Sequence, residues 1–176
     1  TISAQDFQAL VEEYTEVVKF SSGMNALSDE QTNQIKDEVW RAYVNNKLIE
    51  NEAEKLGLTV SKAELQAIID AGAHPMLQQT PFRNPQTGAF DKDMLKKFLV
   101  DYSKMNKAQM PAQYAEYYES MYNFWAFVEK SLIQARLQEK YQALITKSLF
   151  SNPVEAEDAF NARVDQSDLL LAAVPY

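Results

Sequence analysis

The chain has 176 residues, of which 46% are hydrophobic and 24% charged, and its formal net charge is −8. This is enough for one domain with a hydrophobic core. The acidic balance argues against nucleic-acid binding, because contact with phosphates requires a high density of Lys and Arg. Cysteine is absent, which excludes disulfides, thiolate nucleophiles and cysteine-based zinc sites. No run approaches the roughly 20 apolar residues of a membrane span.

Capping signals and apolar periodicity predict four helices in the first part of the chain. They cover residues 3–22, 28–56, 61–71 and 91–103. Serine begins the first three, and the second and third open with a capping-box pattern. Asn46 falls on the apolar stripe of the second helix, where it fits either a half-buried, hydrogen-bonded amide or a polar group that fixes helix register. The aromatic residues Phe82 and Phe90 lie in a Pro- and Gly-rich loop at residues 80–90, and they either pin the loop to the core or border an apolar groove.

The longest predicted helix covers residues 112–149, because no Gly or Pro follows Pro111 there. One apolar stripe follows the 3.6-residue period in its first half, and a second stripe lies roughly 150° away in its second half. The helix therefore predicts packing against two different bodies. The first stripe comprises Tyr114, Tyr118, Met121, Trp125 and Leu132, and the second comprises Ile133, Leu137, Tyr141 and Leu144.

The C-terminal part predicts a short helix at 153–164, opened by Asn152, Pro153 and an acidic residue two positions later, and a short buried strand at 169–174. We therefore expect an all-α domain with one long helix, a short C-terminal helix and one strand. Its parts are a helical lobe at 1–110, a connecting helix at 111–150 and a tail at 151–176 that leads to a further domain. The chain begins without Met and ends in an apolar segment, so we expect a fragment of a longer protein.

The sequence contains no recognisable catalytic constellation. His74 is the only histidine, so a histidine zinc site and Ser–His–Asp chemistry have no support, and we interpret His74 as structural. No phosphate-binding glycine motif occurs. We predict no catalytic residues, no metal and no cofactor.

The unusual feature is a concentration of aromatic residues and Met between residues 114 and 127. Most of them fit a core, and the alternative is that some stay accessible as an adaptable apolar binding surface. We expect a client groove near the change of stripe, around Tyr117, Phe124 and Phe127. The candidate peptide-binding residues are Phe82, Phe90, Tyr117, Met121, Phe124 and Phe127.

Residues 52–65, with the sequence EAEKLGLTVSKAEL, resemble a segment of the SurA- and PpiD-like periplasmic chaperones. As in that family, a loop with Pro and Phe follows, and then a Gly-Ala-Phe-Asp step at residues 88–91. Residues 39–50 resemble the stretch that precedes this segment, and residues 152–176 resemble the helix and strand that lead towards a parvulin domain. The resemblance implies a SurA N-terminal-like, all-α chaperone domain.

The resemblance also implies a function and a compartment. The domain would bind unfolded or partly folded envelope or outer-membrane polypeptides, without a cofactor and without nucleic acid. This fragment would not be an enzyme, although the parent protein would be a peptidyl-prolyl cis–trans isomerase with its parvulin domain outside this chain. The periplasm is the expected location, with tethering to the inner membrane only through an anchor outside the chain. The alternative is a structural or dimerisation module, a homodimer, without client binding.

Overall fold

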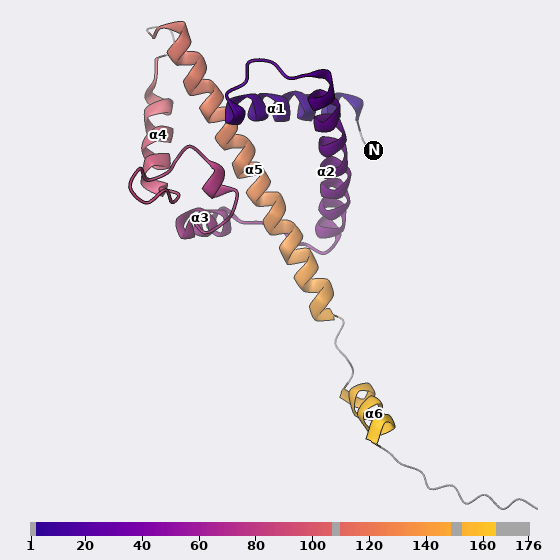
Figure 1. The fold of residues 1–176 in the computed structure, drawn as a ribbon. Helices are drawn as coiled ribbons and strands as arrows, with labels where there is room; N and C mark the ends of the chain where they lie inside the picture. The colour runs from indigo at the N-terminus through magenta and orange to yellow at the C-terminus, as the bar shows by residue number, and fades with distance from the viewer. Residues whose placement is uncertain (1–2, 107–109, 149–152, 165–176) are drawn as a thin grey trace, which may run out of the picture. The chain divides into compact units, whose positions relative to one another are not determined.

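In the computed structural model, the described residues are 3–106, 110–148 and 153–164. They form six α-helices and one short 3-10 helix (Figure 1). These elements are α1 (Ala4–Ser22), α2 (Asp29–Lys55), α3 (Lys62–Ala71), η1 (Leu77–Gln79), α4 (Lys92–Lys104), α5 (Ala112–Ser148) and α6 (Pro153–Val164). The predicted all-α fold is confirmed. The chain divides into two compact units, residues 1–141 and 142–176.

The helix boundaries follow from the capping residues that the sequence displays. Ser3, Ser28 and Ser61 each accept a hydrogen bond from a backbone N–H in the first turn of their helix. In α2 and α3 the side chain three residues later accepts a hydrogen bond from the backbone N–H of the serine, which completes the capping box. Gly72 ends α3 in the left-handed conformation, with φ 64°, where a side chain would be strained.

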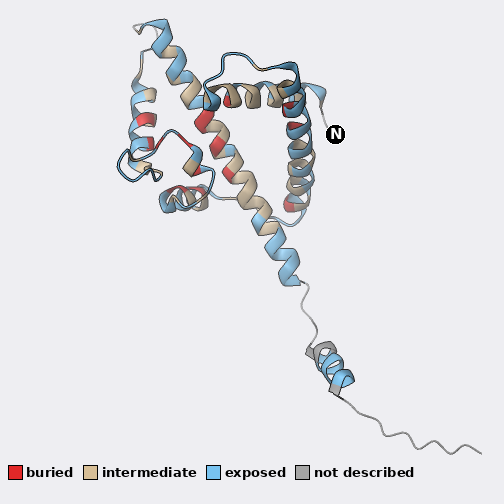
Figure 2. Cartoon of the chain, in the orientation of Figure 1, coloured by how far each residue is buried: buried red, intermediate tan, exposed pale blue. Residues whose placement is uncertain are grey.

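The main core of the first unit surrounds the middle turns of α5. This helix runs between the α1–α2 pair and the α3–α4 segment (Figure 1), and its buried positions lie midway along its length (Figure 2). Burial of this apolar surface is the principal stabilising term of the fold. The buried cluster comprises Val17, Leu65, Ile69, Leu77, Phe82, Leu95, Phe98, Phe124, Trp125, Val128 and Leu132.

The first predicted stripe of α5 needs correction at its N-terminal end. Trp125 and Leu132 are buried as expected, but Tyr114 is 60% exposed. The reason is that the ring contacts of α5 with α1 and α4 begin one turn later, at Tyr117 and Tyr118. Phe124 and Val128 take buried positions that the predicted stripe did not include. In the second stripe Ile133, Leu137 and Tyr141 are half-buried, whereas Leu144 is exposed.

The loop at residues 80–90 is attached to the core by Phe82. Its ring is 3% exposed and lies 5.2 Å from the ring of Phe98 and 6.0 Å from that of Trp125, measured between centroids. A single antiparallel bridge between Arg83 and Phe90 closes the loop. For Phe82, the structure therefore favours the interpretation that the ring pins the loop.

In the second unit, residues 142–176, the described part comprises the end of α5 and α6. The short helix predicted at 153–164 is confirmed. The strand predicted at 169–174 lies outside the described residues. Among the helices that the structure describes, none is long and apolar enough to cross a membrane. The three-part organisation at 1–110, 111–150 and 151–176 stays a prediction.

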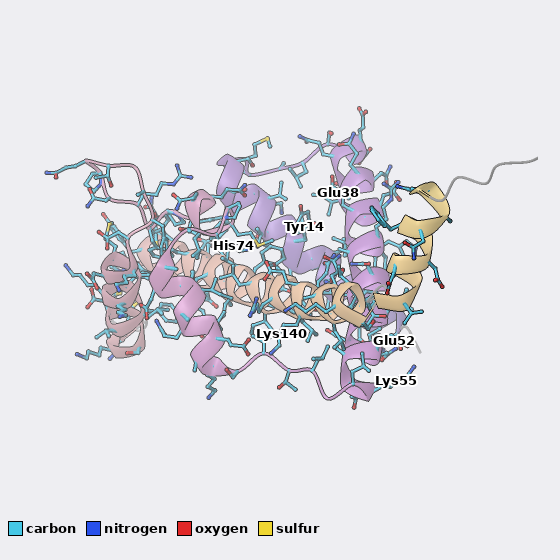
Figure 3. All side chains as sticks on the ribbon, turned by 90° about the horizontal axis from the view of Figure 1, so that it is seen from below. Tyr14, Glu38, Glu52, Lys55, His74 and Lys140 are labelled. Atoms are coloured by element: carbon cyan, nitrogen blue, oxygen red, sulfur yellow. The ribbon has the colours of Figure 1, made fainter. Side chains whose placement is uncertain are left out.

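A polar contact joins the start of α3 to the late turns of α5. Lys140, labelled in Figure 3, donates to the backbone oxygen of Thr59 at 2.6 Å and to Glu64 Oε2 at 3.1 Å. Arg136 Nη2 lies 3.5 Å from Glu64 Oε1. The backbone N–H of Ser61 and the Lys140 ammonium, in that order, hold the pKa of Glu64 below its ordinary value of 4.5. Since the folded pKa is lowered, this contact stabilises the fold above about pH 4.5 and is lost as the pH falls through the folded pKa.

Replacing Lys140 by Gln is expected to raise the pKa of Glu64 towards 4.5, because the remaining cap bond from Ser61 supplies only part of the shift. An NMR titration of the Glu64 side-chain carboxyl measures this change directly. Lys97→Gln is the control, since Lys97 is exposed and has no ion pair with the described residues. A Glu64 titration that is the same in the Lys140→Gln variant and the native chain would contradict the assignment.

Candidate functional site: a cleft between three helices

A cleft of about 680 Å³ lies between α1, α2 and α5 in the first unit. The buried residues of α2, namely Ile35, Val39 and Ala53, are not part of the main core cluster of the described residues. Along part of its length α2 therefore does not pack closely against α5, and the cleft occupies the space between the two helices. Its lining comprises Asp6, Ala9, Leu10, Glu13, Tyr14, Glu38, Val39, Ala42, Tyr43, Asn46, Lys47, Glu50, Met76, Phe127, Lys130, Ser131, Gln134, Ala135 and Gln138.

The walls of the cleft are largely apolar because each helix turns small or aromatic residues towards it. The rings of Tyr14 on α1 and Phe127 on α5 meet with centroids 5.6 Å apart. Val39 and Ala42 supply the α2 wall, and Ala42 is exposed to solvent. Such a surface can receive apolar side chains of a ligand by removing them from water.

Charged residues form the rim of the cleft, and its two lysines are paired. Lys130 lies 3.0 Å from Glu13, which connects α5 to α1. Lys47 lies 3.4 Å from Glu50 within α2. The side-chain amide of Gln134 donates to Glu50, which connects α5 to α2. The Lys130–Glu13 and Gln134–Glu50 contacts therefore join α1 and α2 to neighbouring turns of α5.

Tyr14 and Glu38 form a further polar pair across α1 and α2 (Figure 3). The Tyr14 hydroxyl donates to Glu38 Oε2 at 3.3 Å. Burial raises the pKa of Tyr14 above its ordinary value of 10.0, and the charge of Glu38 raises it further. Tyr14 therefore stays a neutral hydrogen-bond donor at physiological pH.

The structure separates the six predicted peptide-binding residues. Only Phe127 lines the cleft. Tyr117 is exposed beside Phe20, with ring centroids 6.0 Å apart, while Phe90 and Met121 are half-buried against the core. The other two, Phe82 and Phe124, are buried in the core.

Burial argues against ligand contact by Phe82 and Phe124, because a ring enclosed by neighbouring side chains presents little surface to a ligand, and their role in peptide binding stays a prediction. Phe124 is covered by Phe20, with ring centroids 5.5 Å apart, and Phe82 by Phe98 and Trp125. For Phe90, Tyr117, Met121 and Phe127 a role in peptide binding stays a prediction.

The α1 and α2 walls of the cleft were not predicted from the sequence. One signal was present, since Asn46 interrupts the apolar stripe of α2 one turn after the small residue Ala42. Such a polar residue and small residue on the inward face of α2 are consistent with a space between α2 and α5. Asn46 is half-buried and lines the cleft.

The arrangement supports non-covalent binding. His74 lies in a turn, and its Nδ1 accepts a hydrogen bond from the backbone N–H of Met76 at 3.3 Å. Across the part of the chain that the structure describes, no three His, Asp or Glu side chains gather as a metal site. The cleft offers apolar walls, paired ions and polar side chains, which are the elements of a peptide- or ligand-binding surface.

The family model for the SurA-like N-terminal domain matches residues 1–99, which is more than half of the chain. The match includes α1, α2 and α3 and ends within α4, so two of the three cleft walls lie inside it. No curated protein and no solved structure gives a significant match. SurA-like N-terminal domains are non-catalytic chaperone modules, typically periplasmic, in a family that includes parvulin-type prolyl isomerases. The chain therefore belongs to the SurA-like N-terminal domain family.

Proposed function

We propose that this chain binds unfolded or partly folded polypeptides in the cleft between α1, α2 and α5. It would do so as the chaperone domain of a cell-envelope peptidyl-prolyl cis–trans isomerase whose parvulin domain lies outside this chain. The observation that carries the proposal is an open, apolar-walled cleft in a member of a chaperone-type family. The clients are envelope or outer-membrane polypeptides in the periplasm.

The energetics of such a cleft suit transient binding. An aromatic side chain offers about 150–250 Å² of surface, and burial of apolar area contributes about 25 cal/mol per Å². One or two client rings between Tyr14, Phe127 and Val39 would therefore contribute several kcal/mol. Ordering of the unfolded client offsets much of this gain, which keeps the affinity modest and the exchange fast.

Filling the cleft tests the proposal. Ala42 is exposed and lines the cleft, so Ala42→Trp is expected to place an indole in the client's position while α2 stays folded. We expect the Kd for a fluorescent, aromatic-rich unfolded peptide to rise about tenfold or more, because an excluded ring forfeits its burial energy. Fluorescence anisotropy measures the Kd, and suppression of aggregation of an unfolded outer-membrane protein gives a second readout.

The matched control is Ala67→Trp, the same substitution at an exposed position of α3 away from the cleft. It should bind the peptide as the native chain does. Equal binding by the Ala42→Trp variant, the Ala67→Trp variant and the native chain would remove the cleft as the client site.

The alternative is a structural or dimerisation module, and a second surface favours it. Trp40 and Leu48 on α2 and Leu56 at its C-cap are large apolar side chains that are 46%, 61% and 51% exposed. Exposed apolar side chains of this kind can contribute to pairing with a second copy of the chain. Analytical ultracentrifugation distinguishes the two functions, since a dimer that dissociates on Leu48→Lys and fails to bind any unfolded peptide would support assembly over client binding.

A further inference from the structure

Two carboxylates that line the cleft have no cation partner among the described residues. Both lysines of the lining are engaged, Lys130 with Glu13 and Lys47 with Glu50. Asp6 and Glu38 also line the cleft, and neither forms an ion pair with a described residue. Glu38 accepts a hydrogen bond from the Tyr14 hydroxyl, a neutral donor that does not cancel its charge. The apolar walls of the cleft are therefore bordered by net negative charge.

A second observation concerns the α5 wall. The Nε2 amide of Gln134 donates to Glu50, and this bond fixes which end of the side chain points to the carboxylate. The other end, Oε1, is buried and has no hydrogen-bond partner among the described residues. A buried acceptor without a donor is costly, so a rotation of the Gln134 side chain that exposes Oε1 to the cleft would let a ligand N–H form the missing bond. The backbone N–H of an extended polypeptide is such a donor.

We propose that this cleft selects, among unfolded polypeptides, segments that carry Lys or Arg beside their apolar side chains. This inference rests on the proposed function and specifies its client class. The client's apolar side chains would lie against Tyr14 and Phe127, its cationic group would face Asp6 and Glu38, and a backbone N–H would reach Gln134 Oε1. Segments that carry Asp or Glu in the same places are disfavoured, because like charges repel across the cleft.

The test uses three fluorescent peptides of about a dozen residues with identical apolar residues. They differ only in two positions, which hold lysine, glutamine or glutamate. We expect the lysine peptide to bind about fivefold more tightly than the glutamate peptide at low salt, in keeping with partly exposed ion pairs. At about 1 M salt the Debye length falls to about 3 Å, and the ratio should approach one.

The decisive variant is Asp6→Asn combined with Glu38→Gln, in which the side-chain amide introduced on α2 can still accept from the Tyr14 hydroxyl. In this double variant the lysine peptide should bind at most about twofold more tightly than the glutamate peptide. The matched control, Glu12→Gln with Asp37→Asn, removes two exposed carboxylates from the same two helices outside the cleft lining and should keep the ratio. This control separates a local effect from the net charge of −8. Because Asp6 lies in the first turn of α1, Glu38→Gln alone is a second variant that keeps this helix start intact.

The outcomes distinguish the inference from the proposed function. Equal binding of the three peptides, or a ratio that survives in the Asp6→Asn/Glu38→Gln variant, overturns the charge selection. In that case binding of the glutamine peptide, and its loss in Ala42→Trp, still supports the client cleft. No binding of any of the three peptides overturns both. A ratio lowered by the cleft variants alone supports the inference.

Discussion

Replacing Trp125 by Ala is expected to lower the free energy of unfolding by about 3–5 kcal/mol, the range for deletion of a buried aromatic side chain. Trp125 is 3% exposed in the centre of α5, and its ring lies edge-on to Phe82 with centroids 6.0 Å apart. The indole fills the region where α5 meets the loop and α4, so its loss leaves a cavity that the neighbouring rings can only partly fill. Equilibrium urea unfolding measures the change.

Trp40→Ala is the control, because the chain contains only two tryptophans and the second is 46% exposed. Trp40 makes an edge-on contact with Phe7, with centroids 5.4 Å apart. We expect a loss of about 1 kcal/mol, the value typical of one aromatic pair. If Trp125→Ala and Trp40→Ala cost the same small amount, Trp125 is not a core residue and its ring becomes available for binding.

The helices of this chain could be predicted from the sequence because their signals are local. The serine caps, the capping boxes and the left-handed Gly72 act within a few residues, so they fix where α1, α2 and α3 begin or end. The buried side of the middle of α5 could also be predicted, since apolar residues at helical spacing indicated burial of Trp125 and Leu132.

The cleft could not be predicted in the same way because it depends on distances between helices. Helical periodicity shows which face of α2 points inward, but it does not show that Val39 and Ala42 stop short of α5. The same limit explains the error at Tyr114, which follows the helical period of the stripe but is 60% exposed and has no ring contact among the described residues. Aromatic content alone directed the predicted site towards the core, where Phe82 and Phe124 are enclosed.

Phe82→Ala is expected to lower the free energy of unfolding by about 3–5 kcal/mol and to leave peptide affinity unchanged under conditions where the variant is folded. The ring is 3% exposed and contacts both Phe98 and Trp125, so it connects the loop at residues 80–90 to α4 and α5. Its removal takes away the main apolar attachment of this loop. Urea unfolding measures the stability, and fluorescence anisotropy with the aromatic-rich peptide measures the affinity.

The control for this substitution is Phe90→Ala in the same loop. Phe90 is half-buried, and its backbone N–H donates to Gln78 Oε1 at 3.3 Å, a bond that survives the change. Phe90→Ala should therefore lower the free energy of unfolding distinctly less than Phe82→Ala does, because the Phe90 ring buries less apolar area. An unchanged stability of the Phe82→Ala variant together with lost peptide binding would return Phe82 to the client surface. The opposite pattern assigns the ring to the core and leaves client contact to the walls of the α1–α2–α5 cleft.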